Sequence, residues 1–134
     1  MPKFGSRSKE RLDTCDKRIQ EIFDFVVHHF DCTILEGHRS EERQNMLFDT
    51  GKSQLRYPAG RHNTQPSRAV DVVPYPIDWN DRERFHYFSG FVLGVAKMMN
   101  IDVRWGGDWD SDTEVDDNTF DDLPHFELVD KKVD

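Results

Sequence analysis

The chain has 134 residues, about the length of one domain, and we expect residues 1–134 to fold as a single unit. It is 36% hydrophobic and 33% charged, with 10 Phe, 3 Trp and 3 Tyr, which provides enough apolar volume for a folded core. The net charge of -8 argues against nucleic acid as a partner, because phosphate binding draws on clustered Lys and Arg.

The sequence contains no stretch that approaches the roughly 18 apolar residues of a membrane span, so we expect no membrane insertion. Its N-terminal segment is basic but has no apolar run behind it, which predicts a protein made in the cytoplasm without a signal peptide. Cys15 and Cys32 are too few for a disulfide scaffold and are expected to be small core residues in a reducing compartment.

The first half of the chain predicts two helices, one strand and a long loop. Residues 16–30 have the apolar spacing of an amphipathic helix, with Thr14 or Asp16 as its cap. Residues 32–36 read as a β-branched strand, and Ser40 begins a second helix that runs toward Phe48. Residues 51–67 contain Gly and Pro without an apolar period, which indicates a long loop of the kind usually kept for function.

The second half predicts three strands and the longest helix. Residues 69–73 form an apolar strand interrupted by Asp71, and residues 80–99 form a helix with one apolar stripe. Residues 103–105 and 126–129 read as two further strands, separated by an acidic loop at 106–124. These elements predict an α+β fold in which helices pack on a small, mainly antiparallel sheet.

His62, Asp71 and His125 are the candidates for a metal site, because catalytic zinc takes three His or carboxylate ligands and leaves one position open. They converge only if the strands at 69–73 and 126–129 are neighbours. The alternatives are a solvated loop histidine at 62, a buried acid paired with Arg68 or Arg104 at 71, and a strand-edge histidine at 125.

Four segments, in order along the chain, resemble the motifs of the M15 family of zinc peptidases. They are GHRSEERQ at 37–44, SRAVD at 67–71, WGGDW at 105–109 and DLPHFE at 122–127. The family includes D-Ala-D-Ala carboxypeptidases and the L-alanyl-D-glutamate endopeptidases of phage endolysins. The resemblance implies a Hedgehog/DD-peptidase-like architecture and assigns the Zn2+ ligands to His62, Asp71 and His125.

The resemblance also places the general base, an acid three residues before the last histidine, at Asp122. Many family members separate the first histidine from the aspartate by six residues, whereas this chain has eight between His62 and Asp71 and carries Thr64 at the usual position. Asp121 is the rival base, but neighbouring residues of an extended segment point in opposite directions, so only one of the two acids faces the metal.

The family's arginine falls on Arg39, which is expected to stabilise the oxyanion or to bind a substrate carboxylate; the alternative is a salt bridge with Glu42 or Glu36.

Ser40 is expected to cap its helix. Gln44 is expected on the helix surface in contact with substrate. Trp105 and Trp109 either line the cleft or pack in the core, and we assign Trp105 to the substrate.

The acidic loop repeats carboxylates at Asp108, Asp110 and Asp112, which echoes the first part of a calcium loop. The central glycine and final glutamate of an EF-hand are missing, so the choice lies between a Ca2+ site and a solvated acidic loop.

The resemblance therefore implies a zinc peptidase, acting as a monomer, that cuts peptidoglycan stem peptides at the L-Ala–D-Glu bond as a phage endolysin. Such a protein would wait in the host cytoplasm and act on the cell wall after the membrane is opened. The alternatives are a D-Ala-D-Ala carboxypeptidase or dipeptidase, and a cell-wall-binding module that keeps the metal but lacks catalysis.

Overall fold

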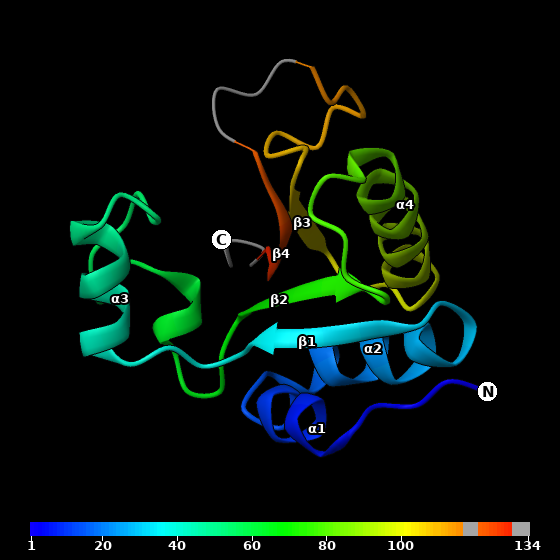
Figure 1. The fold of residues 1–134 in the computed structure, drawn as a ribbon, viewed down its shortest axis with the longest axis horizontal. Coiled ribbons are helices and arrows are strands. Elements are labelled where there is room, and N and C mark those ends of the chain that lie inside the picture. Colours follow the sequence, from blue (N-terminus) through cyan, green and yellow to red (C-terminus); the bar gives the residue numbers. More distant parts are fainter. Residues whose placement is uncertain (117–120, 130–134) are drawn as a thin grey trace.

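A computed structural model describes residues 1–116 and 121–129 and has the predicted α+β architecture (Figure 1). The helices are α1 (Ser6–Leu12), α2 (Lys17–His29), α3 (Glu41–Asp49) and α4 (Arg82–Met98), with a 3-10 turn η1 (Arg61–Asn63). The strands are β1 (Cys32–Glu36), β2 (Ala69–Pro74), β3 (Val103–Gly106) and β4 (Asp122–Leu128). Within the described residues, no helix is both long and apolar enough to cross a membrane.

The four strands form one antiparallel sheet in the order β1-β2-β4-β3. Val70 pairs with Phe126, and the next pair along the ladder is Asp71 with His125. Because successive side chains of a strand point to opposite faces, these two pairs lie on different faces of the sheet. One face is therefore apolar, and the other carries the candidate ligands.

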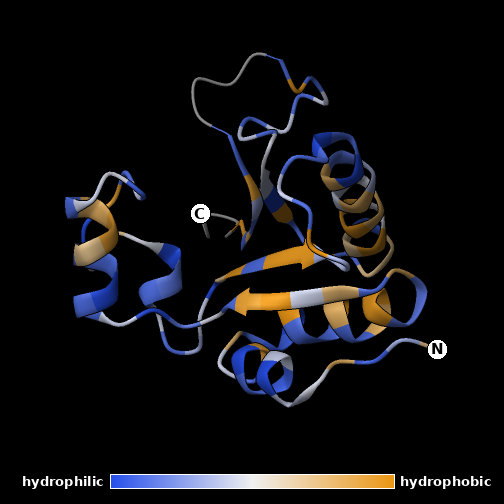
Figure 2. Ribbon diagram, in the orientation of Figure 1, coloured by the Kyte–Doolittle hydropathy of each residue, from blue (hydrophilic) through white to orange (hydrophobic). Residues whose placement is uncertain are grey.

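The apolar face is covered by α2 and α4, which pack on each other and on the sheet. Phe23 of α2 and Phe88 of α4 both meet the ring of Phe126 edge-on, with centroid distances of 5.6 and 6.3 Å. Figure 2 shows the resulting distribution, with apolar residues on the strands and inner helix faces and mainly hydrophilic residues in the described part of the β3–β4 connection. Both cysteines are buried and unbridged, as expected.

Two helix starts follow the predicted capping chemistry. The side chain of Asp16 accepts a hydrogen bond from Arg18 N at the start of α2, which decides between the two proposed caps. Ser40 accepts from Arg43 N at the start of α3. The short helix α1 was not predicted, because its sequence SRSKERL has no apolar stripe and buries only Ser8 and Leu12.

The last strand is longer than predicted, since β4 begins at Asp122 rather than at residue 126. The register explains the difference: Trp105 pairs with Phe126, but the adjacent Gly106 pairs with Asp122. One step along β3 thus corresponds to four along β4, so the segment that contains Pro124 bulges out of the ladder.

Candidate metal centre

The structure brings His62, Asp71 and His125 together at the open face of the sheet. His62 Nε2, His125 Nδ1 and Asp71 Oδ1 are each 3.3 Å from the other two atoms. All three side chains are largely buried. The loop of eight residues between His62 and Asp71 therefore does not prevent the two side chains from meeting, and the three donors surround one point that a metal ion can occupy.

His62 is held by the segment that follows β1. Its Nδ1 donates a hydrogen bond of 2.7 Å to Gly37 O, which leaves the lone pair of Nε2 to face a metal ion. The backbone carbonyl of His62 accepts a hydrogen bond from Arg39 N at 2.8 Å. Asn63 closes the turn η1 by accepting from Gly60 N and donating to Arg39 O, both at 3.0 Å. The long loop is thus pinned where it delivers its histidine.

His125 lies between two carboxylates. Its Nδ1 faces Asp71, and its Nε2 lies 2.8 Å from Glu127 Oε1 on the same face of β4. Burial opposes a charge here, but the hydrogen bonds with Asp71 and Glu127 raise the pKa of His125 to about 9. The same contact outweighs burial at Glu127 and lowers its pKa to about 2. The site is therefore arranged to hold positive charge.

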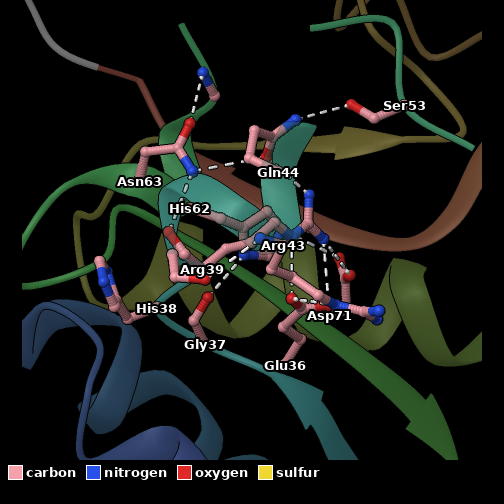
Figure 3. A network of polar contacts seen from close by, with 12 residues as sticks. Glu36, Gly37, His38, Arg39, Arg43, Gln44, Ser53, His62, Asn63 and Asp71 are labelled. Carbon is pink, nitrogen blue, oxygen red and sulfur yellow. Dashed lines mark hydrogen bonds and ion pairs between the residues drawn. The ribbon is translucent and has the colours of Figure 1, made fainter. Parts of the chain in front are cut away.

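Asp71 and Arg39 form the second side of the site (Figure 3). Burial disfavours the carboxylate, yet the charge of His62 and the hydrogen bond with His125 hold the pKa of Asp71 well below its usual range. Arg39 approaches Asp71 Oδ2 at 3.4 Å and grips Glu36 through two nitrogens at 2.8 and 3.2 Å. Arg39 therefore forms the salt bridge with Glu36 that was the predicted alternative, and it also orients the candidate ligand Asp71.

Asp122, rather than Asp121, faces the ligands. Its Oδ2 lies 4.0 Å from His125 Nδ1, and its side chain is 36% exposed toward the cleft. In a regular strand, residues three apart point to opposite faces, so the β4 bulge is what brings Asp122 to His125. Burial and the charge of Asp71 raise the pKa of Asp122. Asp121 instead pairs with Arg82 at 2.8 Å.

The ligands open into a cleft of about 1170 Å³, with walls from α3, the loop before η1, the start of α4 and the β3–β4 connection. Gln44 is one of the residues that line this cleft, but it is only 1% exposed, which corrects its predicted position on the helix surface. Its amide donates to Ser53 Oγ and Leu55 O at 2.9 and 2.5 Å, and its oxygen accepts from Arg39 at 3.1 Å (Figure 3). Through these hydrogen bonds Gln44 connects α3 to Arg39 and to the loop at Ser53 and Leu55.

Trp105 is not among the residues that line this cleft, contrary to the prediction. It pairs with Phe126, shares that residue's apolar face, and donates from Nε1 to Leu123 O at 2.7 Å. Trp109 takes the position at the site, with its ring centroid 5.5 Å from that of His125. The two tryptophans of the motif thus divide between core and cleft.

The carboxylates of Asp108, Asp110 and Asp112 also come together, with one oxygen of each within 4.8 Å of the others. Backbone amides of the same loop approach them: Thr113 N donates to Asp108 Oδ2 at 3.0 Å and Glu114 N to Asp112 Oδ1 at 2.8 Å. The second part of the predicted acidic loop, residues 117–120, lies outside the described residues.

Several residues of the site were not identified from the sequence. They are Glu127 and the two arginines that contact it, Arg61 and Arg104. Trp109 was named as a cleft candidate, but the assignment to substrate went to Trp105. Glu127 was detectable in principle, because it follows His125 by two residues and so shares its face. The arginines were not, since their contact with Glu127 depends on the strand register and on the path of the long loop.

Comparison with known proteins gives a consistent picture. The family model for phage L-alanyl-D-glutamate peptidase matches residues 1–129. The chain is 31% identical over 137 residues to the L-alanyl-D-glutamate peptidase of Escherichia phage T5, covering 95% of this chain and 98% of that protein. The crystal structure of the Serratia marcescens L-Ala D-Glu endopeptidase ChiX is similar with a TM-score of 0.72 and 27% identity, covering 94% of this chain and 89% of that one.

Proposed function

The chain belongs to the phage L-alanyl-D-glutamate peptidase family, and on that premise we propose that it hydrolyses the L-Ala–D-Glu bond of peptidoglycan stem peptides as an endolysin. The observation that carries the proposal is the triangle of His62, Asp71 and His125 donor atoms beside a cleft that also contains Asp122. A cell-wall-binding module has no use for a carboxylate in that position.

Zinc fits this donor set. Ligands at about 2.0–2.1 Å in a tetrahedron lie about 3.3–3.4 Å apart. The donor atoms of His62, Asp71 and His125 are separated by 3.3 Å, and they leave one side open to the cleft. The outer nitrogens of both histidines also have acceptors, Gly37 O and Glu127, as metal-bound imidazoles usually do.

His62, Asp71 and His125 would hold the zinc ion, which would supply Lewis acidity toward a peptide carbonyl and a nearby water. Asp122 accepts the proton of the attacking water and returns it to the leaving amine, a role to which its raised pKa is suited. Arg39 keeps Asp71 in place through its contact with Oδ2 and places a guanidinium at the wall of the cleft. Its role as oxyanion stabiliser remains part of the proposal.

The test compares Asp122→Ala with the matched neighbour Asp121→Ala on purified peptidoglycan, in zinc-loaded protein. We expect turbidity loss and fragments with a new N-terminal D-Glu, a loss of about 100-fold or more in Asp122→Ala, and a far smaller effect in Asp121→Ala. Release of D-Ala alone would favour a carboxypeptidase, and zinc binding without any cleavage would favour a binding module.

Calcium at Asp108, Asp110 and Asp112 stays a prediction with its own consequence. An ion there would order the connection that leads into Asp122 and His125, so we expect activity to fall when calcium alone is removed. Undiminished activity in a chelator selective for calcium over zinc would contradict it.

In the cell, we propose that the protein acts as a monomer on the wall after another protein has opened the host membrane. An elution volume of a dimer in size-exclusion chromatography would contradict the first part.

A further inference from the structure

The cleft has a cationic corner, formed by Arg61, Arg104 and Glu127, whose two arginines take no part in the metal chemistry. Arg61 Nε lies 2.6 Å and Arg104 Nη2 lies 2.8 Å from the same oxygen, Glu127 Oε2. Two guanidinium charges therefore meet one carboxylate. The corner has a surplus of one positive charge, in a chain whose net charge is -8.

The two arginines are accessible, whereas their shared carboxylate is covered. The side chains of Arg61 and Arg104 are 35% and 36% exposed and line the cleft, but that of Glu127 is 7% exposed. Each guanidinium has five N–H donors, and a single oxygen of Glu127 serves both. Nε of Arg104 is buried without a hydrogen-bond partner in the part of the chain that the structure describes. Donors are thus in excess at this corner.

The cationic corner adjoins the reacting centre. Arg104 pairs with Glu127 across the β3–β4 ladder and therefore shares the open face with His125. Its guanidinium lies 5.6 Å from the ring centroid of Trp109, which in turn lies 5.5 Å from that of His125. Arg104 and the ligand His125 therefore both lie against the ring of Trp109.

Arg39 cannot serve the same purpose without breaking existing contacts. It grips Glu36 through two nitrogens, contacts Asp71 and donates to Gln44. Its side chain is 11% exposed, and the two carboxylates already offset its charge. Arg39 is therefore already occupied, whereas Arg61 and Arg104 share a single carboxylate oxygen of Glu127.

We propose that Arg61 and Arg104 bind the free carboxylate of the glutamate at the scissile bond and so select acidic over amidated stem peptides. This inference rests on the proposed function. A glutamate within a peptide keeps one carboxylate, whichever carboxyl group continues the chain, and amidation removes that charge. Guanidinium groups match a carboxylate with two parallel hydrogen bonds, a geometry that an amide cannot reproduce with equal strength.

The experiment measures kcat/KM of the zinc-loaded enzyme on two peptides that differ only in a free or amidated carboxylate on the D-glutamate. The wild-type enzyme is expected to prefer the acidic peptide by about 10- to 100-fold, as charge-assisted hydrogen bonds allow. Arg104→Gln and Arg61→Gln should each lose most of that preference by slowing only the acidic peptide. Arg104→Lys keeps the charge but not the planar guanidinium, so its preference for the acidic peptide should lie between those of the wild type and Arg104→Gln.

Arg82→Gln is the matched control, because it removes another positive charge from the cleft lining and should leave the preference unchanged. A purely structural role would slow both peptides equally, and that result would overturn the proposal, as would equal cleavage of both by the wild-type enzyme. Cleavage of neither peptide by the wild-type enzyme would instead reject the proposed function itself.

Discussion

Glu127 joins the metal site to the cationic corner. One of its oxygens faces His125 Nε2, and the other accepts from Arg61 and Arg104. The carboxylate therefore fixes the ring orientation in which His125 Nδ1 points to Asp71, and it offsets part of the charge of two arginines. Carboxylates behind metal-binding histidines commonly have this orienting effect.

We predict that Glu127→Gln weakens metal binding by about 10- to 100-fold. The amide keeps one acceptor for His125, but its NH2 group then faces two guanidiniums and the uncompensated charge rises from one to two. Zinc affinity, measured by competition with a chromophoric chelator, tests this. Glu21→Gln, the same change on the exposed face of α2, should bind zinc as the wild type does. Equal affinities of both variants would contradict the role.

For single residues, side-chain chemistry and motif order identified the candidate metal ligands but not the residues packed around them. His62, Asp71 and His125 were predicted together, and the structure places them together. Trp105 was assigned to the cleft because the sequence does not reveal which face of β3 is apolar. The register with Phe126 decides that it is core.

Among the elements, the bulge of β4 has the most direct consequence for catalysis. It allows Asp122 and His125 to share a face, and it depends on the close approach of Gly106 to Asp122. A Cβ at Gly106 would lie 2.0 Å from the backbone oxygen of Asp122, so the two strands would have to separate. The positions of β2 and α4 were predictable from periodicity, but a bulge leaves no such signal.

We expect Gly106→Ala to lower the stability by more than about 1 kcal/mol and to reduce activity further by displacing Asp122. Gly94→Ala is the matched control. It lies within α4, where a Cβ would meet nothing within 4 Å, so the variant should gain up to about 1 kcal/mol from helix propensity and keep full activity. Urea unfolding and turbidity assays measure both. A Gly106→Ala enzyme with wild-type activity would show that the bulge tolerates displacement.

Across the whole molecule, the three ligands come from η1, β2 and β4. Strands β2 and β4 are fixed by the sheet and by the core behind it, whereas η1 is joined to them mainly through polar contacts with the segment after β1. Figure 1 shows α3 standing apart from the rest of the fold on this same side. A metal ion bound to His62 would therefore connect the polar half of the cleft to the rigid sheet.

Metal binding should accordingly stabilise the entire fold. An ion that binds only the native state adds about 2.7 kcal/mol at a free concentration 100 times its dissociation constant, enough to raise Tm by several degrees in a domain of this size. Zinc should produce this shift reversibly, with a chelator returning Tm to its starting value. His62→Ala should abolish the shift whatever its own Tm, because one of the three donors is then missing. If zinc shifted Tm equally in that variant, the stabilising ion would have to bind elsewhere, and the acidic loop at Asp108, Asp110 and Asp112 would be the place to look.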